Sequence, residues 1–176
     1  VLISSAAMAA AALPAAAVDF GFYCLTGNLA GDCAIGEAQL SVDVTDLGGG
    51  QVGFEFLNSG PADSSITDVY FDDGTLLGIA SIVNGAGVSF GAPAVPSELP
   101  GAVGASPPFV TTAGFSADSD PPAQPSGVNP SEWVCIIFDL QLGRTYADVL
   151  TELADGTLRI GIHVQGFSSG GSESLI

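Results

Sequence analysis

Short segments in which apolar and polar residues alternate, separated by glycine and proline, constrain this chain more than any other feature. Residues 38–46 and 51–57 alternate in this way on either side of the glycine run at 48–50. A period of two is typical of half-buried strands, and glycine tolerates the backbone angles of a tight reversal. The two segments therefore predict a β-hairpin over residues 39–57.

Further segments also have the pattern of strands: 18–25, 66–72, 75–83, 88–90, 132–142 and 158–167. Residues 66–72 and 75–83 flank Asp73-Gly74, a dipeptide that favours a tight hairpin turn, so we expect these two strands to pair. Residues 132–142 and 158–167 are strongly apolar or cleanly alternating, and we expect both to lie in the interior of a sheet.

One segment has a helical period instead. Residues 145–154 place their apolar side chains on one helical face, with Thr145 as N-cap, Asp148 at the capping-box position and Gly156 just past the end. The chain has 24 glycines and 11 prolines, which suits short strands and many turns. We predict a mainly β fold, an antiparallel, jelly-roll-like β-sandwich with one short α-helix near 145–154.

The first 17 residues have the composition of a secretory signal peptide. They are uncharged, small and apolar, and they end in three alanines, which fits a small-x-small cleavage site before Val18. A membrane anchor is the alternative, although the stretch is shorter than about 20 residues and contains Pro14. Because no initiating methionine or basic start precedes it, we expect the signal peptide to be truncated at its start.

The rest of the chain predicts one folded unit. We expect a single β-rich domain over residues 18–167 and the start of a Gly/Ser linker over residues 168–176. Residues 91–130 hold nine of the 11 prolines, which predicts a long surface loop rather than part of a central sheet. Long loops of this kind often bind ligands, so a binding surface is expected there first.

The charge balance restricts the classes of partner. The chain has 19 acidic residues against Arg144 and Arg159, with no lysine, for a net charge of −17. Nucleic acid and anionic membrane surfaces bind clustered basic residues, so both are excluded as partners. The acidity itself has two explanations, solubility in salty or extracellular conditions and a specific cation site.

Cysteine and histidine usage argues against several kinds of catalytic or metal site. Cys24 and Cys33 lie nine residues apart around a Gly-Asn turn, which predicts a disulfide in an oxidising compartment. Cys135 lies in an apolar run and is expected to be a buried free thiol. The single histidine, His163, is expected to be an outward surface residue, and one histidine with scattered cysteines provides neither a catalytic triad nor a zinc site.

Two hypotheses for ligand sites remain. Calcium is the only cofactor that the sequence suggests, at Asp118 and Asp120 or at Asp72 and Asp73, although ordinary turn chemistry explains both clusters as well. The aromatic residues Phe109, Phe115 and Trp133 could stack on a sugar ring, and core packing is the alternative. No catalytic residue is predicted.

Four segments, 36–44, 64–82, 115–133 and 158–174, resemble one recurrent type of PEP-CTERM protein. These are exported proteins of bacteria that possess exosortase. The resemblance implies export, anchoring in the envelope or release after processing, and an association with exopolysaccharide or biofilm matrix. The sorting tail that defines the family is not present in this chain, and membrane contact is expected only through that missing C-terminal tail.

Taken together, these features predict a secreted or cell-surface protein of bacterial type. We expect a non-enzymatic surface or extracellular-matrix protein whose partners are polysaccharide or other envelope components. The alternatives are a carbohydrate-binding module that uses the 91–130 loop, and a secreted hydrolase with two carboxylates in a cleft, at least one of them desolvated.

Overall fold

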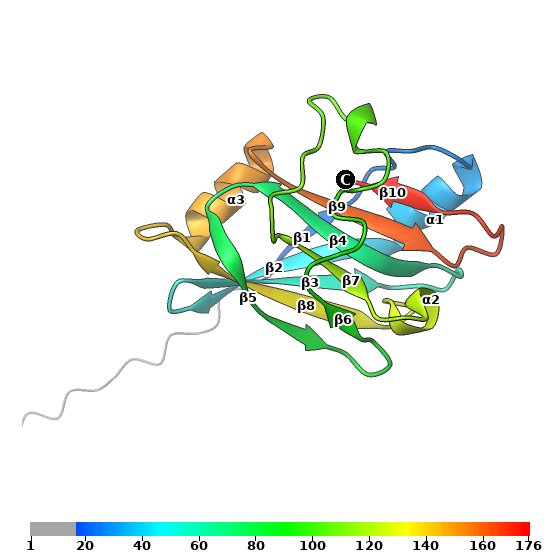
Figure 1. Ribbon diagram of the computed structural model, residues 1–176, viewed down its shortest axis with the longest axis horizontal. Coiled ribbons are helices and arrows are strands. Elements are labelled where there is room, and N and C mark those ends of the chain that lie inside the picture. Colours follow the sequence, from blue (N-terminus) through cyan, green and yellow to red (C-terminus); the bar gives the residue numbers. More distant parts are fainter. Residues whose placement is uncertain (1–16) are drawn as a thin grey trace, which may run out of the picture.

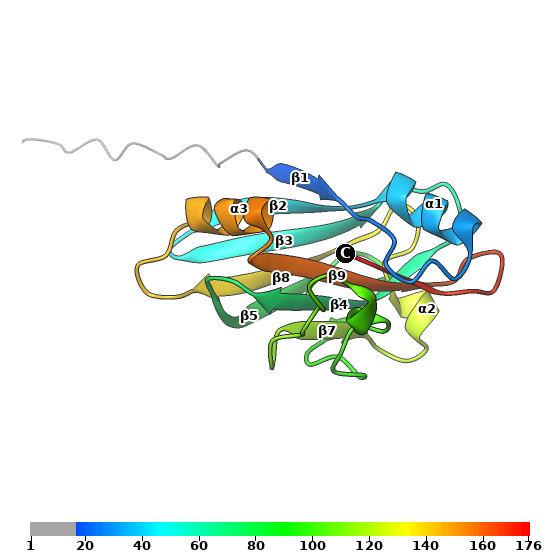
Figure 2. The same cartoon turned by 90° about the horizontal axis from the view of Figure 1, so that it is seen from above.

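Residues 17–176 of the computed structural model form two five-stranded antiparallel sheets that pack as the layers of a β-sandwich (Figures 1 and 2). The first sheet has the order β1 (Val18–Gly21), β2 (Leu40–Gly48), β3 (Gln51–Asn58), β8 (Trp133–Leu140), β5 (Leu76–Asn84). The second sheet has the order β10 (Glu173–Leu175), β9 (Leu158–Gln165), β4 (Ser65–Asp73), β7 (Ser116–Ser119), β6 (Phe90–Gly91). The predicted fold class is confirmed.

The core lies between the sheets and is rich in phenylalanine. Phe71 of β4 lies edge-on to Phe54 of β3 and to Phe138 of β8, with ring centroids 5.0 Å and 4.7 Å apart. All three side chains are fully buried. Along a strand, side chains point alternately to the two faces of the sheet, and these three occupy inward positions. The period of two in the sequence therefore produces this core.

The predicted hairpin and the predicted interior strands are confirmed. β2 and β3 pair in register, with Val42 opposite Phe56, and the chain reverses through Gly48, Gly49 and Gly50 at positive φ. β8 lies between β3 and β5, and β9 lies between β10 and β4.

The expected pairing of 66–72 with 75–83 is wrong, because β4 and β5 lie in different sheets. Asp73 and Gly74 have the predicted positive φ. However, the Thr75 backbone N–H donates to the Glu152 carboxylate at 2.7 Å, and the Thr75 carbonyl accepts from the Gln141 N–H at 3.0 Å. These contacts direct the chain across the sandwich instead of back along β4.

Helix α3 (Tyr146–Asp155) has the predicted capping box between Thr145 and Asp148 and ends at Gly156. The expectation of a single helix is wrong: α1 (Ala30–Gln39), α2 (Ala123–Ser126) and the 3-10 turn η1 (Ala102–Gly104) are also present. The sequence of α1 contains Gly31 and Gly36, which weaken a helix prediction. At Gly36 an added Cβ would lie 2.8 Å from a Leu175 methyl, so packing against β10 requires glycine there.

The proline-rich segment 91–130 is not simply a surface loop. It contains β7, an interior strand of the second sheet, and α2. Residues 92–112, here called the cover loop, pack over the outer face of that sheet. Their buried members Ala94, Leu99, Ala102, Ala105 and Phe109 form a second small core with Tyr70 of β4. Proline stiffens the cover loop, while side-chain packing rather than a strand ladder holds it in place.

Residues 168–176 do not behave as a linker in this structure. Glu173, Ser174 and Leu175 form β10, pair with β9 and are fully buried. The predicted signal peptide lies outside the described residues except for Ala17, and β1 begins at Val18. Within residues 17–176, no helix has the length and apolar character needed to cross a membrane.

Candidate functional site

Three titratable side chains form a row across the outer face of the second sheet. Asp68 of β4 is the register partner of His163 of β9 on one side and of Asp118 of β7 on the other. Directly opposed residues of antiparallel strands have Cβ atoms about 4.5–5.5 Å apart, so the three side chains are immediate neighbours. The row is assembled from segments about 50 residues apart in sequence.

A β-bulge sets the position of this row. The register of β4 against β9 shifts between Ile66 and Asp68, so that Thr67 is the additional residue. Ile66 and Val69 both point into the core, although an unbroken alternation would place them on opposite faces. Thr67 donates a hydrogen bond from Oγ1 to Asp68 Oδ2 at 2.7 Å. Bulges often re-aim side chains beside functional sites, and this one places Thr67 beside the row.

The row forms part of the floor of a cavity of about 280 Å³, here called the acidic cleft. Asp120 and Gln165 also line it, and its walls include Pro96 and Pro100 of the cover loop and Pro121 before α2. The polar lining residues are Thr67, Asp68, Asp118, Ser119, Asp120, His163 and Gln165. The cleft is therefore polar, with an excess of carboxylates.

Burial shifts the pKa values of two residues of the row, Asp68 and His163. Asp68 is 6% exposed, and its burial raises the pKa of the carboxyl above 3.8, against the opposing effects of the Thr67 hydrogen bond and of His163. Asp118 adds repulsion in the same direction as burial. Burial lowers the pKa of His163 below 6.5, despite Asp68 and Glu173 nearby. His163 is therefore neutral at pH 7.

Hydrogen bonds orient the remaining groups around the cleft. His163 Nδ1 lies 3.1 Å from Ser174 Oγ of β10. The Tyr70 hydroxyl donates to the Pro96 carbonyl at 3.1 Å, and the Val95 N–H donates to Asp118 Oδ2 at 3.0 Å. The cover loop and β10 thus hold the side chains of the acidic cleft from both sides.

The four predicted calcium ligands do not form one site. Asp118 and Asp120 lie in the acidic cleft, where Asp120 Oδ2 accepts from Ser89 Oγ at 2.7 Å. Asp72 forms an ion pair with Arg159 of β9, and Asp73 is exposed. In the described part of the chain, three ligand atoms gather within 4.8 Å only at Cys24, Cys33 and Glu173, where both sulfurs belong to a disulfide. Neither predicted aspartate pair belongs to such a group among residues 17–176, and calcium binding at either pair stays a prediction.

The three aromatic residues predicted to stack on sugar do not share a surface, so that prediction is wrong. Phe109 is 3% exposed in the cover loop, beneath the Arg159 guanidinium at 5.4 Å from the ring centroid. Phe115 is buried in the main core, and Trp133 is half-buried on β8 in the first sheet. Two of the three are core residues, which was the alternative explanation.

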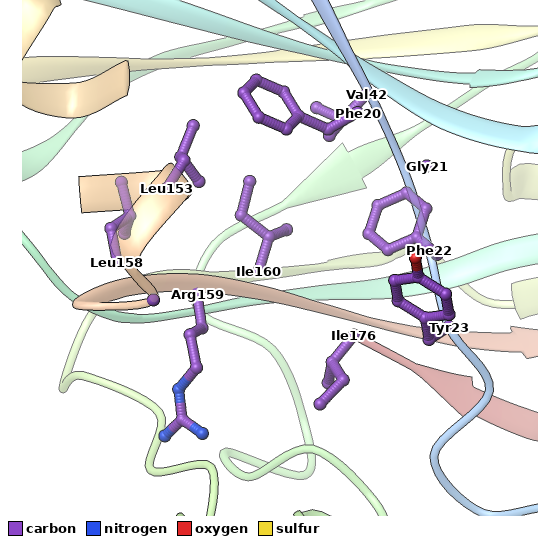
Figure 3. A pocket seen from close by; sticks show the side chains of 11 residues that line it. Phe20, Gly21, Phe22, Tyr23, Val42, Leu153, Leu158, Arg159, Ile160 and Ile176 are labelled. Atoms are coloured by element: carbon purple, nitrogen blue, oxygen red, sulfur yellow. The ribbon is translucent and has the colours of Figure 1, made fainter. Parts of the chain in front are cut away.

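An apolar pocket of about 300 Å³ lies between β1, α3 and β9 (Figure 3). Phe20 and Phe22 line it from the N-terminal strand and the residue after it, and Leu153 and Ile160 line it from α3 and β9. Tyr23 is 78% exposed at its rim. Arg159 also borders the pocket, but its guanidinium is bound to Asp72 and to two cover-loop carbonyls. The pocket therefore offers apolar contact with little polar specificity.

A third cluster joins the two ends of the described chain. Cys24 and Cys33 form a disulfide, and Glu173 of β10 is fully buried beside it. The Glu173 carboxylate accepts from the Asn28 N–H at 3.0 Å and the Leu29 N–H at 2.6 Å. Cys135 is a half-buried free thiol, and burial raises its pKa to about 11.

The sequence does not predict that Asp68 and His163 lie side by side. The alternation of 158–167 places His163 on the outer face correctly, but it does not show that β10 and the cover loop half-bury the ring. Asp68 lies within the expected strand 66–72, and no pattern of residues in the sequence predicts the bulge at Thr67. Searches against protein-family models, curated proteins and solved structures each found no match to this chain.

Proposed function

We propose that this protein is exported and works at the cell surface or in the extracellular matrix by binding polysaccharide, without catalysing a reaction. The observation that carries the proposal is the Cys24–Cys33 disulfide. Disulfides persist in oxidising compartments outside the cytoplasm and are rare inside it. The start of β1 at Val18, the predicted first residue after signal cleavage, agrees with this placement.

The partner class follows from charge and from the acidic cleft. A chain with net charge −17 is repelled by nucleic acid and by anionic lipid. The acidic cleft instead offers carboxylate, imidazole and amide groups, which bind hydroxyl-rich ligands. The resemblance to PEP-CTERM proteins points to the same partner, an exopolysaccharide.

A secreted hydrolase is the second candidate, and one observation favours it. Asp68 is desolvated with a raised pKa, and it lies opposite Asp118 in the same cleft. A carboxyl with a raised pKa beside a second carboxyl is an arrangement that can supply the acid and base of glycoside hydrolysis. Release of reducing ends from polysaccharide by the purified protein, abolished in Asp68→Asn and in Asp118→Asn, would favour this function.

Mass analysis of the protein recovered from envelope and medium of the producing cells tests export. We expect a chain that begins at Val18, with Cys24 and Cys33 protected from alkylation until a reductant is added. Sedimentation with purified matrix polysaccharide then tests binding. Recovery of the protein only inside the cell, with residues 1–17 attached and three alkylatable thiols, would refute the proposal.

A further inference from the structure

We infer that the acidic cleft binds an amino-sugar unit of a polysaccharide, with its ammonium group between Asp68 and Asp118 and its hydroxyls towards His163 and Gln165. The inference rests on the proposed function and specifies its ligand. Three properties of the cleft support it: its uncompensated charge, the spacing and kind of its polar groups, and its size.

Within residues 17–176, the carboxylates of the cleft have no cationic partner. The protein has two arginines and no lysine. Arg159 is bound to Asp72 and to the Pro107 and Pro108 carbonyls, and Arg144 is exposed before α3. His163 is neutral at pH 7 because burial lowers its pKa. A bound ammonium group would therefore relieve the repulsion between Asp68 and Asp118 and form charge-assisted hydrogen bonds with them.

The spacing of the groups favours an organic cation over a metal ion. Calcium requires six to eight oxygens at 2.3–2.6 Å from one point. Among residues 17–176, no three carboxylate or imidazole ligand atoms of the cleft lie within 4.8 Å of one another. A sugar unit carries its amino and hydroxyl groups several ångströms apart, so it can reach partners that one ion cannot.

The cleft also holds groups that a simple cation would not use. His163 Nδ1 contacts Ser174, and within the described residues Nε2 has no hydrogen-bond partner. The Gln165 side chain, which both donates and accepts, lines the same cavity. These neutral groups suit sugar hydroxyls, and the proline walls supply rigid apolar contact to the edges of a ring.

The cavity has room for a small ligand. Its volume of about 280 Å³ corresponds to roughly nine water molecules at about 30 Å³ each. The cleft is open to solvent, so neighbouring units of a polymer can extend out of it. A uronic acid is excluded, because its carboxylate would face three aspartates.

Calorimetric titration with three defined oligosaccharides tests the inference: glucosamine oligomers, their N-acetylated forms and galacturonate oligomers. We expect the purified protein to bind the glucosamine oligomer, and the N-acetylated and uronate forms at least tenfold more weakly. Asp68→Asn and Asp118→Asn should each weaken binding of the glucosamine oligomer about tenfold or more. Asp139→Asn, which removes one exposed carboxylate from the first sheet, should leave it unchanged.

Circular dichroism establishes that each variant is folded, and Asp118→Asn, at a half-buried position, remains informative if Asp68→Asn does not fold. Equal binding of the acetylated and amino forms, insensitivity to both cleft variants, or displacement by calcium chloride alone would each overturn the inference. Polysaccharide sedimentation without a preference for amino groups would do so while leaving the proposed function standing. Failure of export or of all polysaccharide binding would refute the proposed function itself.

Discussion

The Glu173 carboxylate accepts a hydrogen bond from the Leu29 backbone N–H at 2.6 Å, which joins the last strand to the loop that the disulfide closes. Glu173 is fully buried, so removing its carboxylate leaves several donors without an acceptor. We expect Glu173→Ala to lower the free energy of unfolding by about 2–4 kcal/mol. Urea unfolding measures this, and Asp139→Asn, an exposed carboxylate, should change it by less than about 0.5 kcal/mol.

The same carboxylate makes stability depend on pH. Burial acts to raise the pKa of Glu173, but hydrogen bonds from Thr26, Leu29 and Asn28 outweigh burial, so the pKa lies below 4.5 in the folded protein. A depressed folded pKa gives stability that is present above the unfolded pKa and is lost as pH falls through the folded pKa. Melting curves between pH 6 and pH 3 should show this loss. In Glu173→Gln the decline below pH 4.5 should be smaller, and an equal decline would contradict the assignment.

The disulfide should stabilise the fold by restricting the unfolded chain. Cys24 and Cys33 are nine residues apart, and closing a loop of that length is worth about 2–3 kcal/mol. We therefore expect the Cys24→Ser/Cys33→Ser double variant to unfold at a lower urea concentration, by that free energy. Dithiothreitol should destabilise the parent protein and Cys135→Ser alike, but not the double variant. If the reductant also destabilised the double variant, the effect would not come from this bond.

Local patterns predicted the strands and the capped helix because each depends on neighbours in sequence. The capping box of α3 needs only residues three apart, and the alternation around Phe54 and Phe56 shows which side faces the core. The pairing of β4 could not be predicted in this way. The turn at Asp73-Gly74 has the expected backbone angles, and only contacts with the distant Glu152 and Gln141 direct β5 into the other sheet.

The candidate site was less predictable than the fold, for the same reason. The sequence suggests Asp118 as a calcium ligand, and this residue lines the acidic cleft. Its neighbours Asp68 and His163 become neighbours only through strand register and a bulge. The sugar-stacking prediction fails because an aromatic residue in a proline-rich segment can be buried, and Phe109 anchors a second core.

Gly161 allows the cover loop to lie close to β9. A Cβ at this position would meet a Leu99 methyl at 2.6 Å and the Phe109 ring at 3.2 Å. We expect Gly161→Ala to destabilise the protein by about 1–3 kcal/mol through overpacking, and to increase proteolysis within residues 92–112. Gly78→Ala on the edge strand β5, where an added Cβ meets nothing within 4 Å, is the matched control. Equal effects of the two substitutions would show that strand propensity, not the cover loop, is responsible.

Cys135 should react slowly while the protein is folded. Burial raises the pKa of its thiol to about 11, with a further contribution from the charge of Glu55. At pH 8 the thiolate that reacts with iodoacetamide is therefore a very small fraction. We expect slow labelling in buffer and fast labelling in urea, followed by mass spectrometry. Rapid labelling of the folded protein at pH 8 would show that Cys135 is accessible and ionised.

Binding in the acidic cleft should weaken as the pH is lowered, starting above the ordinary titration range of aspartate. Burial raises the pKa of Asp68 above 3.8, so this carboxylate loses its charge at a higher pH than an ordinary aspartate does. Protonation of His163, whose pKa lies below 6.5, adds a positive charge as the pH falls. Both events act against a bound ammonium group.

Titrations of the glucosamine oligomer at several values from pH 7 to pH 4 separate these contributions. The parent protein should lose affinity progressively, because each proton removes a favourable interaction with the ammonium group. In Asp68→Asn the affinity for the oligomer should be low at pH 7 and should fall less on acidification. In His163→Gln the loss of affinity caused by protonation of Asp68 should remain. Glu98 of the cover loop and Glu173 of β10 also lie near the cleft, so Glu98→Gln serves as the control for long-range charge. A pH profile unchanged by Asp68→Asn would mean that the ammonium group does not bind beside this carboxylate.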